Sequence, residues 1–216
     1  KGELFAPKEG DNERRIMQVI DFRFRFRTAE CLPEYIPEIK PEFADWIHLY
    51  DISDRVSAIS IEEQIEMMDA AGVEKAVTCS VSHDTNRLLY EIEKKHPGKV
   101  YGLAMADARE GIKTACYELE KAYDEYGLYG LALGPYSTGL SMTDRKNYPL
   151  YAISEKKGKL VNLHSSIHFN RTKSFRLGDP IQLDDIAMDF PELKIIMSHA
   201  GSGFGTTPIS IAMRHP

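Results

Sequence analysis

The chain has 216 residues and a formal net charge of −6, so its length fits one domain with a sizeable core. The acidic balance argues against nucleic acid or an anionic membrane as the main partner, because both attract basic surfaces. There is no apolar run long enough to cross a bilayer and no signal-peptide pattern, and the three cysteines form no CxxC motif. These features predict a reduced, cytoplasmic setting rather than a disulfide framework.

Six short segments are typical of β-strands, because they are apolar and mostly bounded by Gly, Pro or charged residues. They are residues 17–26, 76–81, 100–106, 130–133, 160–164 and 193–199. Segments with helical start and stop signals lie between them. Ser60 and Glu63 form a capping box, for example, and Pro180 stands at the first position of a later helix.

The first strand alternates charged and aromatic residues, and alternate side chains point to opposite faces of a sheet. One face carries Asp21, Arg23 and Arg25, and the other carries Phe22, Phe24 and Phe26. In a barrel we expect the phenylalanines to pack under the helices and the charged residues to point into the mouth. Two inward arginines are costly unless they are paired or bind an anion. They therefore indicate either a site for a substrate carboxylate or phosphate, or a structural salt-bridge cluster with Asp21 and other acids.

A long insertion, residues 27–59, separates the first strand from the first capped helix. It contains three prolines and several aromatic residues, including Tyr35, Phe43, Trp46 and Tyr50. Because loops of this length are usually functional or disordered, we expect an ordered, lid-like segment over the barrel mouth.

The alternation of strand and helix predicts a parallel sheet with helical crossovers. A doubly wound sheet also fits, but a (β/α)8 TIM barrel is favoured, since polar residues end nearly every strand and no Gly-rich phosphate loop follows the first. Residues 1–216 would then be a single TIM-barrel domain with about six of its eight strand–helix units. Residues after Pro216, or less favourably another chain, would supply the last two.

Histidines end the fifth and sixth predicted strands, at His164 and His199. One such histidine is more often structural, but two at equivalent positions of neighbouring strands favour an active site, because imidazole can carry a proton or bind a metal. The loop 167–178 adds His168 and Arg171, which would close over an anionic ligand. Ser80, His83, Asp107 and Tyr136 follow other strands and are less specific.

Several motifs together resemble the amidohydrolase-related proteins of the amidohydrolase 2 type, in the branch that contains aminocarboxymuconate semialdehyde decarboxylase. They are Val19-Ile20-Asp21-x-Arg23-x-Arg25, Tyr148-Pro149-Leu150-Tyr151, Val161-Asn162-Leu163-His164, Asp189-Phe190-Pro191-Glu192-Leu193-Lys194 and Ile196-Met197-Ser198-His199-Ala200-Gly201. The resemblance covers roughly residues 16–216.

The resemblance implies a (β/α)8 barrel with one divalent metal, usually zinc. The metal would be held by a His-x-His pair on the first strand, a histidine on the fifth and an aspartate on the eighth. His164 matches the fifth-strand ligand, and His199 matches a sixth-strand histidine that acts on a proton or contacts the substrate. Arg23 and Arg25 stand in place of the His-x-His pair, and guanidinium has no lone pair for a cation. We therefore expect no cofactor, with zinc or another divalent metal at His164 as the alternative.

The sequence thus predicts an enzyme that acts on a small carboxylate-bearing compound. In this enzyme His199 would be the general acid or base, and His164 would orient the substrate or assist proton transfer. Hydrolysis of an amide, ester or lactone is the first choice and decarboxylation the second. The substrate-binding residues would be Asp21, Arg23, Arg25, Ser165 and Arg171. The alternative is a catalytically inactive barrel that binds a small anionic ligand or a protein partner. A homodimer is compatible with either.

Overall fold

The computed structural model describes residues 19–32, 44–51, 57–168 and 172–216. Its strands form one six-stranded sheet in chain order, and every neighbouring pair is parallel. The strands are β1 (Val19–Phe24), β2 (Val73–Cys79), β3 (Val100–Ala104), β4 (Gly130–Leu133), β5 (Leu160–His164) and β6 (Lys194–Ser198). The six strands predicted from the sequence are confirmed, in the order that successive strand–helix–strand units generate.

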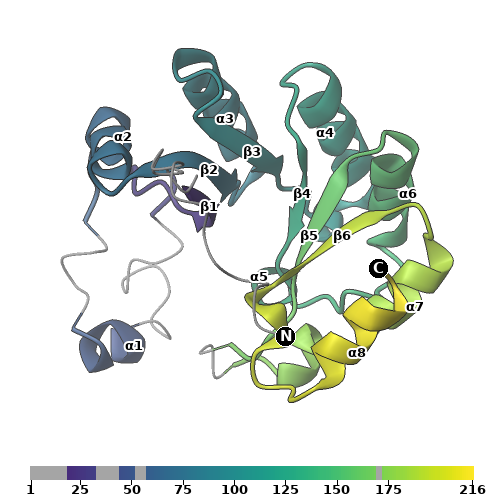
Figure 1. Cartoon of the computed structure of the whole chain (residues 1–216). Coiled ribbons are helices and arrows are strands. Elements are labelled where there is room, and N and C mark those ends of the chain that lie inside the picture. Colours follow the sequence, from purple (N-terminus) through teal and green to yellow (C-terminus); the bar gives the residue numbers. More distant parts are fainter. Residues whose placement is uncertain (1–18, 33–43, 52–56, 169–171) are drawn as a thin grey trace, which may run out of the picture.

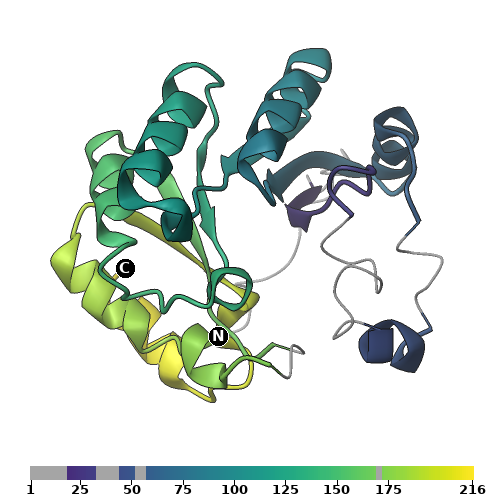
Figure 2. The ribbon, with the colours of Figure 1, turned by 180° about the vertical axis from the view of Figure 1, so that it is seen from behind.

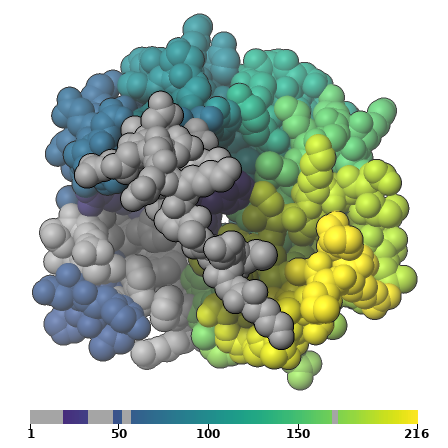
Figure 3. Space-filling model, in the orientation of Figure 1, coloured from purple at the N-terminus to yellow at the C-terminus, as the bar shows by residue number. Residues whose placement is uncertain are grey.

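Six of the described helices lie along the outer face of the curved sheet, and the views from front and behind agree on this (Figures 1 and 2). They are α2 (Ile61–Ala70), α3 (His83–Lys95), α4 (Ile112–Asp124), α6 (Tyr148–Lys156), α7 (Gln182–Asp189) and α8 (Thr207–Arg214). The short helix α1 (Ala44–Leu49) lies apart from the sheet, and α5 (Pro135–Thr138) is a single turn at the end of β4 (Figure 1). A doubly wound sheet would carry helices on both faces. The chain is therefore a partial (β/α) barrel, and its units follow one another around a common centre (Figure 3). None of the helices in the described ranges is long and apolar enough to span a membrane.

Side chains of the strands alternate between a packed outer face and the concave interior. Val161 and Leu163 of β5 are fully buried in the core with residues of the helices, such as Leu119 and Ile186. Between them, Asn162 donates from Nδ2 to Sγ of Cys79 at 3.5 Å. Because β2 and β5 are not neighbours in the sheet, this contact crosses the barrel interior. The concave face is thus the one that carries the polar residues.

The first strand is shorter than predicted, because β1 ends at Phe24 and residues 17 and 18 lie outside the described part of the chain. Its aromatic face is also only partly covered. Phe26 is 3% exposed and belongs to the core, as expected, but Phe22 is 39% exposed. β1 is at the edge of the six-stranded sheet, where a side chain has neighbours on one side only.

The second strand ends two residues before its predicted end, because a capping network starts the next helix early. The Ser80 hydroxyl donates to the Ser82 carbonyl at 2.7 Å, which turns the chain after Cys79. The Ser82 side chain then accepts from the Thr85 amide and caps α3, which begins at His83. The chain therefore leaves the sheet at Ser80.

Gly201 tolerates no side chain, and its replacement is the first testable consequence of the fold. A Cβ atom there would lie 2.0 Å from Cγ of Pro208, and its φ of +64° is one that L residues rarely adopt. We expect Gly201→Ala to lower the free energy of unfolding by about 2–4 kcal/mol, since strain and overpacking add. Gly205→Ala is the matched control, because φ is +61° and nothing lies within 4 Å of its Cβ. Urea unfolding measures both, and equal losses would contradict the steric explanation.

Candidate active site

His164 and His199 meet at the carboxyl ends of β5 and β6, as the sequence predicts. β5 pairs with β6 so that His164 lies opposite Ser198, and the two imidazole centroids are 4.5 Å apart. Tyr136 lies on the short helix α5, which follows β4. Its ring makes an edge contact with His164, with ring centroids 5.3 Å apart, and stacks on His168, with ring centroids 4.7 Å apart. Three consecutive strand ends therefore contribute to one cluster of rings.

A left-handed turn holds His199 in place. His199, Ala200 and Gly201 have φ values of 63°, 49° and 64°, and the first two are non-glycine residues in a region that costs about 1–2 kcal/mol each. The turn is closed by the Ser202 amide, which donates to the His199 carbonyl at 3.0 Å, and the Ser202 carbonyl accepts from Ile167 at 3.1 Å. Strain of this kind persists where the surrounding structure enforces it, often at functional sites.

Both imidazoles are held in the neutral form. Burial is the largest cause that lowers the pKa of His164, to about 3, and the neighbouring His199, His168, Arg23 and Arg25 add to it. Burial also lowers the pKa of His199, followed by the charges of Arg23 and Arg25. At neutral pH neither ring is therefore a cation, and the fixed positive charges of Arg23 and Arg25 are part of the reason.

The Ser166 hydroxyl contacts both His164 and the backbone. Its Oγ lies 3.0 Å from Nε2 of His164 and 2.9 Å from the Ile167 carbonyl. Since a hydroxyl has only one proton to donate, the tautomer of His164 decides which of these two contacts that proton serves. Ser166 therefore anchors the His164 ring at the strand end.

Arg23 points into the barrel, as the alternation of β1 predicts. Its Nη1 donates to Sγ of Cys79 at 3.2 Å, and its Nε is buried without a partner among the described residues. Asp21 does not pair with this guanidinium: its Oδ1 accepts instead from the backbone amide of Arg23 at 2.8 Å. Arg23 and Asp21 therefore do not form the ion pair that we expected if the charged face of this strand were a structural salt-bridge cluster.

The other expected substrate-binding residues have different placements. The positive charge of Arg25 contributes to lowering the pKa values of both His164 and His199. Ser165 is fully buried, and its hydroxyl donates to the Ser198 carbonyl at 3.4 Å. Arg171 lies outside the described residues. Of the expected lid, the structure describes residues 27–32, 44–51 and 57–59, so the lid stays a prediction.

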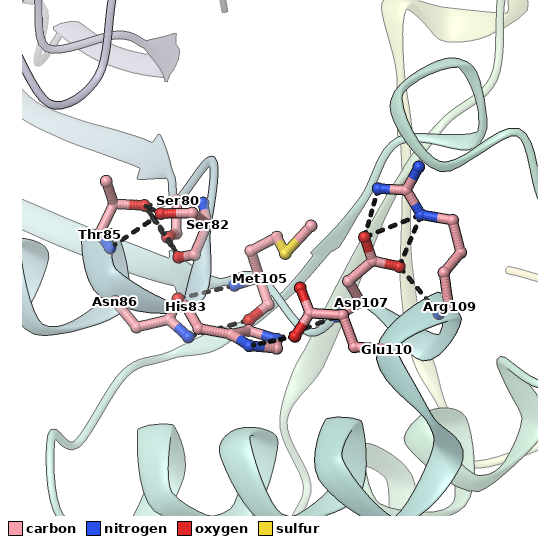
Figure 4. A network of polar contacts seen from close by, with 9 residues as sticks. All are labelled: Ser80, Ser82, His83, Thr85, Asn86, Met105, Asp107, Arg109 and Glu110. Carbon is pink, nitrogen blue, oxygen red and sulfur yellow. Dashed lines mark hydrogen bonds and ion pairs between the residues drawn. The ribbon is translucent and has the colours of Figure 1, made fainter. Parts of the chain in front are cut away.

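His83 and Asp107 belong to a separate network that ties the loop after β2 to the loop after β3 (Figure 4). Nε2 of His83 accepts from the Asp107 amide at 3.1 Å, and Nδ1 lies 3.3 Å from the Glu110 carboxylate. The Asp107 carboxylate is occupied by the Arg109 guanidinium through several contacts. Both nitrogens of His83 therefore have polar partners within this network.

Comparison with known families decides the classification. The model of the protein family described as amidohydrolase matches residues 48–213, which is most of the chain. The chain belongs to the amidohydrolase family. A search of curated protein sequences gives no match.

Solved structures similar to this amidohydrolase-family chain are barrels of the same kind. An uncharacterised TIM-barrel protein from Bordetella bronchiseptica has a TM-score of 0.75 at 23% identity, over 93% of this chain and 73% of that one. The 5-carboxyvanillate decarboxylase of Novosphingobium aromaticivorans, with bound manganese and a substituted nitrobenzoic acid, has a TM-score of 0.66 at 16% identity, over 87% and 67%. The 4-oxalomesaconate hydratase of Rhodopseudomonas palustris has a TM-score of 0.56 at 23% identity, over 91% and 66%. The chain thus spans about two thirds to three quarters of these neighbours.

The described residues do not fit the family's usual divalent metal. No three His, Cys, Asp or Glu side chains within the described ranges are grouped so that they could hold a metal ion. On the first strand, Arg23 and Arg25 stand where the family's metal-binding His-x-His pair is expected. A guanidinium offers no lone pair to a metal ion, and its positive charge repels a cation. His164 alone is far from a full set of ligands. No catalytic step is therefore assigned to a metal.

Sequence reasoning missed Cys79 in this site and did not predict how Tyr136 and His168 stack there. Cys79 at the end of β2 contacts both Arg23 and Asn162, but a lone cysteine in a strand carries no signal of that role. Tyr136 and His168 were noted only as residues of their loops, and their stacking beside His164 depends on how three loops meet. For Asn162 a signal existed, since it shares the strand face of His164.

Proposed function

We propose that this chain carries the active site of a decarboxylase for small carboxylate compounds. One observation carries the proposal: the imidazoles of His164 and His199, with ring centroids 4.5 Å apart, share the barrel interior with Arg23, whose Nε has no partner among the described residues. This arrangement combines a guanidinium that can bind an anion with two imidazoles that can carry a proton.

The arginines supply the affinity for a carboxylate. Guanidinium binds carboxylate oxygens through charge-assisted, often bidentate hydrogen bonds. Arg23 has an unpartnered Nε within the described structure, and its only acceptor there is a sulfur atom. Thiol sulfur is a weak acceptor, so a carboxylate oxygen would be a much better partner.

His199 supplies the proton that decarboxylation consumes. Burial is the largest cause that lowers the pKa of His199, and the charges of Arg23 and Arg25 add to it. When the substrate anion offsets these charges, this second cause weakens and the ring can take up a proton. The C–C bond to the carboxylate then breaks, CO2 leaves, and its bonding electrons stay on the substrate carbon. His199 protonates that carbon, while Arg23 and Arg25 stabilise the developing negative charge.

Hydrolysis is the second candidate, and the family match favours it. It requires a base that takes a proton from water near neutral pH. An imidazole with a pKa of about 3, such as His164, is a weak base for that step. Decarboxylation needs no activated water, and for this reason we place it first.

The experiment that tests the proposal offers the purified protein a panel of carboxylates with a labelled carboxyl carbon. The panel includes 5-carboxyvanillate and 2,6-dihydroxybenzoate, which the similar solved decarboxylases act on or bind. It also includes 4-oxalomesaconate, and esters, amides and lactones of comparable size. We expect labelled CO2 from a carboxylate and, in D2O, one deuterium at the carbon that lost it. Cleavage of an ester, amide or lactone with no CO2 release would favour hydrolysis, and binding without turnover would favour the inactive barrel.

Chelation tests the role of a metal. Because Arg23 and Arg25 occupy the position of the metal-binding pair, we expect CO2 release to survive dialysis against EDTA. Elemental analysis of the purified protein accompanies the assay. Stoichiometric divalent metal, together with activity that is lost on chelation and restored by manganese, would contradict this expectation.

A further inference from the structure

Three side chains from three strands meet below the two histidines, inside the barrel. Arg23 of β1 and Asn162 of β5 both donate to Sγ of Cys79 of β2, at 3.2 Å and 3.5 Å. We name this group, Arg23, Cys79 and Asn162, the floor cluster. Asn162 lies two residues before His164 on the same face of β5, so the floor cluster is continuous with the candidate active site.

The floor cluster has unused hydrogen-bonding capacity. Within the described structure, four buried side-chain nitrogen or oxygen atoms have no partner, and two of them are Nε of Arg23 and Oδ1 of Asn162. Asn162 is only 3% exposed, so its oxygen is not compensated by bulk water. An unmet buried polar group costs about 1–3 kcal/mol. One donor and one acceptor left unpaired in the same cluster indicate a ligand that brings the complementary acceptor and donor.

We propose that the floor cluster is a specificity subsite for a hydroxyl or amino group on the carboxylate substrate. Oδ1 of Asn162 accepts a hydrogen bond from that group, and Nε of Arg23 donates to an oxygen of the same ligand. This assignment rests on the proposed function, because Arg23 also holds the substrate anion there. It adds Asn162 as a residue that selects hydroxy- or amino-substituted carboxylates over those without a donor.

Entry of the ligand exchanges weak contacts for stronger ones. Sγ of Cys79 is the only described acceptor for Arg23, and the contact of Asn162 with it is at the long limit of 3.5 Å. Because sulfur accepts weakly, moving the guanidinium from sulfur to a carboxylate oxygen gains a charge-assisted bond and loses little. A ligand that lacks the donor group leaves Oδ1 of Asn162 unpaired, which is the physical basis of discrimination.

The test compares binding of hydroxy acids with binding of their methyl ethers, which cannot donate. The probes are 2-hydroxybenzoate, 3-hydroxybenzoate and glycolate, each with its methoxy counterpart, and the readout is isothermal titration calorimetry. We expect at least one hydroxy acid to bind about 5- to 30-fold more tightly than its ether, which corresponds to one buried hydrogen bond of about 1–2 kcal/mol. In Asn162→Leu, of similar size, the preference should vanish while thermal stability is kept or raised, because an unpaired buried group has been removed.

Asn162→Asp is the second variant, because it keeps an acceptor oxygen in the same position. It should retain the preference for the hydroxy acid and weaken binding of all the carboxylates by like-charge repulsion. The proposal is overturned if wild-type protein shows no preference in any pair, if none of the probes binds, or if the preference persists in Asn162→Leu. The readout is binding, so the two proposals can fail separately. If carboxylates bind without preference for a hydroxyl group, the subsite proposal is wrong and the proposed decarboxylation is unaffected. If no CO2 is released, the proposed decarboxylation is wrong and the subsite proposal is unaffected.

Discussion

Replacing His199 with glutamine is expected to slow CO2 release by about 10²–10⁴-fold, the range typical for loss of a general acid. Glutamine keeps a side chain that donates hydrogen bonds but cannot deliver a proton. We expect the left-handed turn at residues 199–201 to be kept, because the Ser202 amide can still donate to the carbonyl of residue 199, so the defect should lie in turnover more than in binding. Steady-state kinetics, with substrate binding measured separately, separates kcat from affinity.

The control for this variant is His96→Gln, because His96 ends α3 just before β3 begins, at the end of the barrel away from the strand ends that carry His164 and His199. It should leave the rate unchanged. Deuterium incorporation from D2O gives a second readout: in His199→Gln any residual CO2 release should occur with slower protonation of the product carbon. A His199→Gln protein that releases CO2 at the wild-type rate would remove His199 from the mechanism, and His164 and His168 would then be the imidazoles left in the ring cluster.

Replacing Arg23 with methionine is expected to weaken carboxylate binding by about 10- to 100-fold, since hydrogen bonds to charged groups contribute about 1.5–3 kcal/mol. The same change should raise the pKa of His199, because Arg23 is the first charged group, after burial, that lowers it. It should also raise the pKa of His164, although burial remains the main cause there. Calorimetry measures the binding and NMR titration of the imidazole protons measures the two pKa values.

Arg23→Lys distinguishes charge from geometry. Lysine keeps a positive charge but not the planar, bidentate fork of guanidinium. It should therefore keep much of the depression of the His199 pKa while failing to restore carboxylate binding. Arg87→Met, at an exposed position of α3, is the matched control and should change neither quantity. Unchanged binding in Arg23→Met would show that the anion is held elsewhere, with Arg25 as the next residue to replace.

The lowered histidine pKa values also affect stability. His164 is neutral in the folded state down to about pH 3, but in the unfolded chain it takes up a proton below about pH 6.5. The unfolded state therefore binds more protons between these limits, and the free energy of unfolding falls as the pH drops below 6.5. In Arg23→Met the upward shift of both pKa values should make that loss smaller, which urea unfolding at several pH values would detect.

The order of the elements could be predicted because its signals are local. Alternating apolar periods, helix caps and bounding glycines and prolines are properties of short segments, and they predicted all six parallel strands. The nearness of His164 and His199 also followed from sequence. Both end successive parallel strands, and the carboxyl ends of such strands meet at one edge of the sheet. The inward direction of Arg23 followed from the two-residue period of β1.

The contacts that give these residues their chemistry could not be predicted, because they depend on the curvature of the sheet. Arg23, Cys79 and Asn162 are far apart in sequence and come from strands that are not all neighbours, so only the curvature of the sheet brings them together. The Asp21 carboxylate accepts from the backbone amide of Arg23 rather than from its guanidinium. Both donors are close to Asp21 in sequence, so the sequence pattern does not predict which of them it binds.

The sequence by itself determined that this chain is a strand–helix barrel with two histidines at its mouth and with Arg23 pointing into its interior, because period and strand order fix where side chains point. Only the tertiary structure decided that the histidines are neutral and that a donor and an acceptor remain unpaired beneath them. Burial and distance set those properties, and both arise when distant segments pack together.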